Sequence, residues 1–229
     1  MKGIFFVAAA LLLFPVGAFA QNNSGTHYFD SPGFIAAGAS ALNAYGKTRT
    51  DSDVQPFITG MWSVFRTEYG SFGLSVSGIF ATPYGEYAST RVSYKISSQQ
   101  YIGDFSLNYI KNIKRLNFWL GIGLNLNYLE SQMSSVKNNV TGSKANYKKN
   151  FSQTVYGHQY QIGLDYILTK DGSWGAFALF RGQNTGKAEF NIDRRLVRYS
   201  DGMRRYIRRD YRTMDLSNDL YTVGIVYHF

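Results

Sequence analysis

The residues best suited to chemistry in this chain are basic, and they crowd into two segments. Segment 187–214 holds eight arginines and a lysine against four acids, and segment 131–152 holds four lysines and no acid, in a chain of formal net charge +9. A guanidinium binds phosphate and similar oxyanions through two parallel hydrogen bonds. We therefore predict a polyanion-binding surface, or at least generic contact with anionic lipids, made by Arg194, Arg195, Arg198, Arg204, Arg205, Arg208, Arg209, Arg212, Lys144, Lys148 and Lys149.

Catalysis is the alternative chemistry, and the histidines give it little support. A hydrolase needs a nucleophile beside a base that a carboxylate orients. His158 has Tyr160 two residues on, and Ser152 lies six residues before it. No histidines or carboxylates have the spacing of metal ligands, and there is no cysteine. We predict a protein that is not an enzyme and has no cofactor, with a lipid-modifying enzyme that uses His158 as its base as the alternative.

The N-terminus has the pattern of a secretory signal peptide. Lys2 precedes an apolar stretch, and Ala18-Phe19-Ala20 then offers a small-residue cleavage site before polar residues. We predict a signal peptide over residues 1–20, a short periplasmic tail over 21–33 and a single domain over 34–229.

Eight segments of that domain alternate apolar and polar residues with a period of two, as strands with one apolar face do. The hydrophobic fraction is 45% although the mean hydropathy is −0.22, which fits alternation. Lengths of about 9–14 residues suit tilted membrane strands. The predicted strands are 34–45, 56–66, 72–84, 100–110, 116–128, 156–168, 174–186 and 221–229.

Short and long connections alternate between these strands. Three are tight turns, at 68–71, 112–115 and 170–173, and four are long and polar, at 46–54, 85–99, 131–152 and 187–214. Outer-membrane barrels have short periplasmic turns and long extracellular loops. A soluble lipocalin-type barrel is the alternative, in which the apolar faces would point inward. Aromatic residues near the strand ends predict two interfacial girdles, formed by Tyr84, Tyr101, Tyr109, Tyr128, Tyr156, Trp174, Tyr227 and Phe229.

The chain resembles the small outer-membrane barrels of Gram-negative bacteria, such as the OmpA transmembrane domain and the OmpX and OmpW groups. The resemblance covers residues 34–229 and is architectural. It implies an all-β, up-and-down antiparallel transmembrane barrel in the outer membrane, in contact with outer-membrane lipids and lipopolysaccharide. It also implies that the barrel assembly machinery reads the terminal pattern of Tyr221, Val223, Ile225, Tyr227 and Phe229.

The alternation points a few charged residues into the barrel. Asp104, Asp165 and Arg181 fall on the polar faces, and Glu130 is expected there as well. Arg181 facing lipid near the midplane would cost about 2–4 kcal/mol. Because an eight-stranded barrel is just wide enough for side chains to fill it, we predict an interior polar plug, with a narrow channel as the alternative.

The last long connection contains a hairpin signal, Asp201-Gly202. A two-residue turn there places Tyr199 opposite Arg204, Arg195 opposite Arg208 and Arg194 opposite Arg209. Like charges directly opposite destabilise a ladder, and an anion would relieve them. The sequence favours a surface barrel that binds lipopolysaccharide, another surface polyanion or a partner protein, for adhesion, for envelope integrity or within a larger complex. Export removes nucleic acid as a partner.

Overall fold

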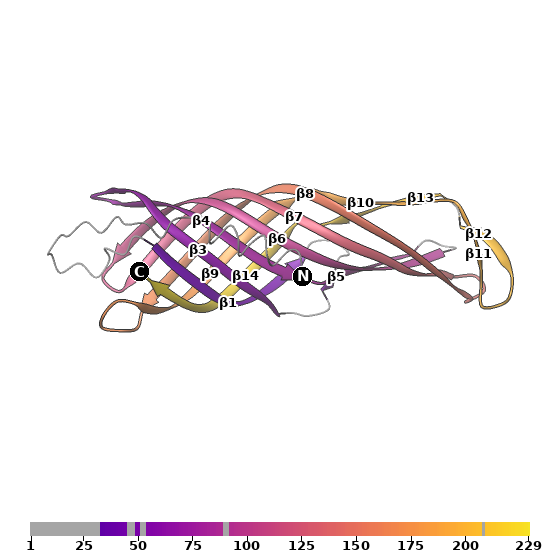
Figure 1. Ribbon diagram of the computed structural model, residues 1–229, viewed down its shortest axis with the longest axis horizontal. Helices are drawn as coiled ribbons and strands as arrows, with labels where there is room; N and C mark the ends of the chain where they lie inside the picture. The colour runs from indigo at the N-terminus through magenta and orange to yellow at the C-terminus, as the bar shows by residue number, and fades with distance from the viewer. Residues whose placement is uncertain (1–32, 45–48, 51–53, 89–91, 208) are drawn as a thin grey trace.

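Eight strands form a closed antiparallel ring in the computed structural model (Figure 1), which describes residues 33–44, 49–50, 54–88, 92–207 and 209–229. Each strand pairs with the next along the chain, and the last pairs with the first. The predicted up-and-down barrel is confirmed. The predicted signal peptide and all but the last residue of the predicted periplasmic tail lie outside the described residues. The ring consists of β1 (Gly33–Ala44), β3 (Val54–Thr67), β4 (Gly70–Ala81), β6 (Val92–Ile113), β7 (Leu116–Asn138), β8 (Lys144–Ile167), β9 (Trp174–Thr185) and β14 (Asn218–His228).

The three central strands continue far beyond the ring. β6, β7 and β8 have 22, 23 and 24 residues, whereas about 9–11 residues cross a bilayer. Their far ends lie beside two short ribbons, β10 (Lys187–Ile192) with β13 (Asp210–Asp215), and β11 (Arg195–Arg198) with β12 (Arg204–Ile207). We call this part the extension; it occupies the right side of Figure 1. Two further short strands, β2 (Arg49–Thr50) and β5 (Pro83–Ala88), pair with each other.

Much of the long connections predicted at 85–99 and 131–152 is strand, because alternation continues there with its polarity reversed. On β7, Leu124 and Leu126 face outward while Asn125 and Asn127 face inward. Beyond Tyr128 the inward residues are apolar except for Ser131, and the outward ones are polar. The outward Tyr128 packs near Tyr101 of β6, with ring centroids 6.2 Å apart, as interfacial aromatics do. This level therefore marks the boundary between lipid and water.

An apolar belt covers the outside of the ring. Ile122 and Leu124 are 70% and 67% exposed, which an aqueous surface would not favour and a bilayer would. The lipocalin-type alternative requires these side chains to point inward, and they point outward. The belt includes Ile35, Phe105, Leu107, Leu120, Leu126, Ile162, Leu164, Val223 and Ile225. No helix among the described residues is long and apolar enough to cross a bilayer.

Two apolar clusters fill the inside of the molecule at different heights. The lower core lies within the ring and includes Phe34, Phe57, Trp119 and Leu220. The upper core lies within the extension and consists of Tyr94, Ile96, Leu129, Met133, Val136, Ala145, Tyr147, Ala188, Phe190, Ile192, Val197, Tyr199, Ile207, Met214 and Leu216.

The predicted ribbon exists, but its predicted register is wrong by one residue. Arg198 lies opposite Arg204, and Arg195 lies opposite Ile207. The hairpin loop has three residues, closed by a hydrogen bond from the Gly202 amide to the Tyr199 carbonyl at 3.0 Å. Gly202 adopts a φ of 79°, the left-handed conformation that three-residue loops need at this position. The predicted pairing of Arg195 with Arg208 is therefore absent; Arg208 itself lies outside the described residues.

Candidate functional site

A basic cleft lies at the tip of the extension, between the first residues of β8 and the strand β11. Its volume is about 770 Å³, and Lys144, Lys148, Arg195 and Arg198 line it together with six uncharged residues. No carboxylate of the described chain lines this cleft. Two hydrogen bonds join its walls: the Ser200 amide donates to the Lys144 carbonyl at 2.8 Å, and the Lys144 amide donates to Ser200 Oγ at 3.1 Å.

Alternation explains why the cations of the cleft face solvent. Tyr147 on β8 and Val197 on β11 are buried in the upper core, so the neighbouring Lys148 and Arg198 face outward. The guanidinium of Arg195 lies 6.0 Å from the centroid of the Tyr147 ring, a distance at which a cation is attracted to an aromatic face. The upper core thus fixes the positions from which these cations project.

The other predicted contact residues are mostly engaged within the extension. Lys149 donates to the Asp193 carboxylate, and this hydrogen bond and charge lower the pKa of Asp193. Arg205 pairs with Asp201 at 3.1 Å and lies over the Tyr199 ring. Arg194 and Arg212 lie over the rings of Tyr206 and Tyr94, and Arg204 and Arg209 are solvent-exposed.

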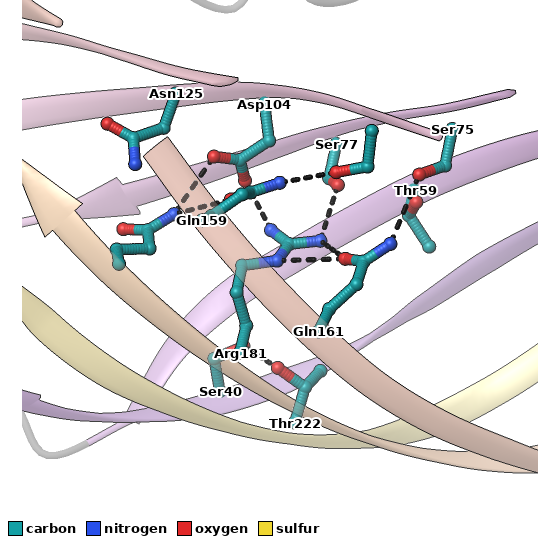
Figure 2. Close-up of polar contacts among 12 residues, drawn as sticks. Ser40, Thr59, Ser75, Ser77, Asp104, Asn125, Gln159, Gln161, Arg181 and Thr222 are labelled. Carbon is teal, nitrogen blue, oxygen red and sulfur yellow. Dashed lines mark hydrogen bonds and ion pairs between the residues drawn. The ribbon is translucent and has the colours of Figure 1, made fainter. Parts of the chain in front are cut away.

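The interior of the ring is centred on a buried ion pair (Figure 2). Arg181 on β9 donates to the Asp104 carboxylate on β6, and both side chains are 1% exposed or less. Arg181 Nη2 also donates to Ser77 Oγ at 2.7 Å and to Gln161 Oε1 at 2.8 Å. Gln183 Nε2 donates a hydrogen bond of 2.9 Å to the other carboxylate oxygen of Asp104. Burial of charge is tolerated when each charge is paired and hydrogen-bonded in this way.

Amide and hydroxyl side chains extend this network across the interior. Gln159 Nε2 donates to Ser106 Oγ at 2.6 Å, and Asn108 Nδ2 donates to Ser75 Oγ at 2.9 Å. All four residues are buried. The phenyl ring of Phe57, from the lower core, lies 5.4 Å from the Arg181 guanidinium. Side chains therefore occupy the interior at this level.

The structure separates the third predicted interior residue from that pair. Asp165 accepts a hydrogen bond from Asn117 Nδ2 at 2.8 Å and lies 3.1 Å from His228 Nε2, near the end that carries the short turns. The sequence did not predict this contact with His228. Because His228 follows the outward-facing Tyr227, its side chain points into the barrel. The prediction that Glu130 points inward is wrong. Odd-numbered residues of β7 face inward at this height, and Glu130 is exposed and accepts a hydrogen bond from Tyr128 at 3.0 Å.

His158 lies exposed on the outer face of β8. Its cross-strand partners are Leu124 and Asn184, neither of which is a nucleophile. Among the described residues no group of three or more His, Cys, Asp or Glu side chains could hold a metal ion.

The terminal pattern lies on β14 and on Phe229, which follows it, at the join between the last strand and the first. Gly224 faces Gly38 of β1, where a Cβ on either would meet the other strand's backbone. The Phe229 amide donates to the Gly33 carbonyl at 3.2 Å. Tyr221, Val223, Ile225 and Tyr227 point outward into the belt.

Comparison with known proteins identifies the fold. No protein-family model and no curated protein sequence matches the chain. Among solved structures, the outer membrane protein OprG from Pseudomonas aeruginosa is similar with a TM-score of 0.58 and 13% identity, covering 87% of this chain and 97% of that chain. A major outer membrane protein from Thermus thermophilus has a TM-score of 0.55 and 12% identity, covering 86% of this chain and 98% of that chain.

These likenesses, at low identity, concern the fold alone. The closed ring, the apolar belt and the likenesses agree that the chain is a small eight-stranded outer-membrane β-barrel. Its place is the outer membrane.

Proposed function

We propose that this barrel is a non-catalytic surface protein that binds polyanions through the basic cleft at its tip. The observation that carries the proposal is the cleft itself, with four cations and no carboxylate in its described lining. One exposed cation contributes little to binding. Several cations around one concave surface focus their field and attract a repeating anion more strongly than scattered charges do.

The length of the extension bears on the nature of the polyanion. β7 continues from Tyr128 to Asn138, and a strand rises about 3.3 Å per residue, so the end of β7 lies roughly 33 Å along the strand from the aromatic girdle. At that distance the cleft is above the lipid head groups. Phosphorylated or sulfated polysaccharide is the polyanion that this position favours, whether it belongs to lipopolysaccharide or to another surface.

The filled interior supports a binding role over the narrow channel that the sequence left open. Arg181, Asp104, Gln161 and Gln183 form a hydrogen-bonded cluster within the ring, and the upper core fills the extension above it. We expect the purified barrel to show no steady conductance in planar bilayers. A stable open current would favour the channel.

A triple substitution tests the cleft directly. Lys148→Gln, Arg195→Gln and Arg198→Gln remove three cleft cations, and the matched control removes three exposed cations elsewhere on the extension with Lys95→Gln, Lys187→Gln and Arg209→Gln. Binding of the barrel in nanodiscs to dextran sulfate and to purified lipopolysaccharide is measured as salt rises. At about 0.2–1 kcal/mol per cation, we expect the cleft variant to bind roughly 3- to 140-fold more weakly.

The control separates a site from general basicity. It should retain most of the affinity and a similar salt dependence, since its lost charges lie outside the cleft. Equal losses in the two variants would show that the extension binds anions only through its net charge. A preference for one of the two polyanions would identify the source of the ligand.

A further inference from the structure

We propose that the opposite mouth of the barrel, the end with the short turns, holds a second binding site for small carboxylate-bearing amides, such as a short acidic peptide. The site is independent of the basic cleft, which lies at the other end of the molecule. The proposal rests on a cavity, on the charges around it and on unpaired polar atoms in its wall.

The cavity has a volume of about 970 Å³ and lies inside this mouth. Its walls come from the β3–β4 turn, the β6–β7 turn and the ends of β8 and β14. The volume is typical of sites for small molecules, which occupy roughly 300–1,000 Å³.

Cations dominate the rim of the cavity. Arg66, Lys111, Lys114 and Arg115 line it, against the single rim carboxylate of Glu68. A second carboxylate, Asp165, lies deeper, where Asn117 and His228 occupy it. The rim therefore favours an anionic group.

The deeper wall is apolar with polar atoms set into it. The Trp119 indole packs on Phe34, with ring centroids 4.7 Å apart. It lies against Gly163, where a Cβ would come within 1.2 Å of Trp119 Nε1. This glycine therefore provides the space in which the indole lies.

Three polar atoms on cavity-lining residues have no hydrogen-bond partner in the described chain: Trp119 Nε1, Asn117 Oδ1 and Ser63 Oγ. A buried polar group without a partner is unfavourable. The amide N–H of a ligand would satisfy an acceptor such as Asn117 Oδ1 after a small side-chain adjustment, and its carbonyl would accept from Ser63 Oγ. Trp119 Nε1 faces Gly163 of β8, so the indole contributes its ring to the wall. A ligand with an amide at its deep end and a carboxylate at the rim matches both regions.

The three tryptophans of the chain provide a direct readout. Trp62, Trp119 and Trp174 each give one indole signal in a nitrogen–proton correlation spectrum, and the Trp119→Phe variant assigns the signal of the cavity. The N-acetylated peptide Ala-Glu-Ala-Ala is titrated into the barrel in nanodiscs. We expect a saturable shift of the Trp119 signal, whereas the signal of Trp174, exposed on the outer surface, stays in place.

Charge controls complete the test. The amidated peptide with Gln in place of Glu should bind at least about tenfold more weakly, because the rim cations attract the carboxylates. Lys114→Asn with Arg115→Gln should weaken binding similarly, whereas Lys170→Gln, a turn cation outside the lining, should not. An unmoved Trp119 signal, equal binding of both peptides, or equal losses in the rim and Lys170 variants would overturn the proposal. None of these outcomes bears on the basic cleft.

Discussion

The lower and upper halves of β7 share one backbone geometry but have opposite polarity on their two faces. Below Tyr128 the outward residues are Leu, Ile and Phe and the inward ones mostly Asn and Gly. Above it, Leu129 and Met133 point inward, and Glu130 and Gln132 point outward. Hydrocarbon surrounds the lower half, so its apolar side chains point outward into lipid. Water surrounds the upper half, so its apolar side chains point inward, away from water. The direction in which the apolar side chains of β7 point therefore shows which part of the strand lies in lipid and which part lies in water.

The two halves also differ in how they are closed. In the ring each strand pairs with two neighbours through the backbone, as a lipid environment requires. Above the pair formed by Gly157 and Thr185, β8 has no ladder with β10. Side chains cross this gap instead: Gln153 Nε2 donates to the Glu189 carbonyl, and the Glu189 amide donates to Gln153 Oε1 at 2.8 Å. The extension therefore depends more on its apolar core than the ring does.

The largest effect is expected in the ring. Asp104→Leu leaves the Arg181 guanidinium buried without its counter-ion, which destabilises a protein by about 3–5 kcal/mol. Urea unfolding in lipid vesicles measures the loss. The double variant with Arg181→Leu should recover most of it, because no unpaired charge remains. A double variant as unstable as the single one would contradict the paired-charge explanation.

A loss of similar size is expected in the extension, but it should stay local. Phe190 is fully buried and packs edge-on against Phe151, with centroids 5.2 Å apart. Phe190→Ala should remove about 3–5 kcal/mol of packing. Hydrogen exchange should speed up in β10, β13 and the far ends of β7 and β8, while the ring keeps its protection. Faster exchange throughout the ring would show that the halves unfold together.

Arginine substitutions on the outer face of β7 test whether lipid surrounds its lower half and water its upper half. Ile122→Arg places a charge in the lipid belt and should cost about 2–4 kcal/mol. Gln132→Arg on the same face of the same strand lies in water and should cost less than about 0.5 kcal/mol. Folding free energies in lipid vesicles compare the two. Similar costs would place the lipid boundary elsewhere on β7.

The side-chain bridge across the gap should have a smaller effect. Gln153→Leu removes both hydrogen bonds to Glu189 and should weaken the extension by about 1–3 kcal/mol, since backbone groups lose their partners. Exchange of the Glu189 amide reports the opening. Ser152→Leu, on the exposed face of the same strand, serves as the control and should leave that amide protected.

The smallest expected effect concerns pH. The Lys149 ammonium lowers the pKa of Asp193, so the ionised carboxylate favours the folded extension. This contribution is present at neutral pH and is lost as the pH falls through the lowered folded-state value. Local exchange in wild type and in Asp193→Asn should therefore differ slightly at neutral pH and converge in strong acid. A difference that grows in acid would contradict the pairing.

The sequence alone predicted the eight membrane strands, their short turns and, for the third to sixth strands and the last one, which residues face lipid. These features depend on a period of two along one strand, and that period is local. The same local pattern placed Arg181 and Asp104 inside, although it could not show that they meet. It also placed His158 on the outer face, away from the interior.

Contacts between distant segments decided the rest. Residues 92–99, 129–138 and 144–155 form strands whose apolar side chains point inward. The sequence did not indicate this, because it does not show the upper core against which those side chains pack. The ribbon register depended on one extra loop residue, and a slip of one residue changes every cross-strand pair. The basic cleft joins Lys144 on β8 to Arg195 and Arg198 on β11, and this contact needs the folded extension. At the end with the short turns, Asn117 and Asp165 already face each other on neighbouring strands. Only the closure of the barrel brings His228 of β14 to Asp165.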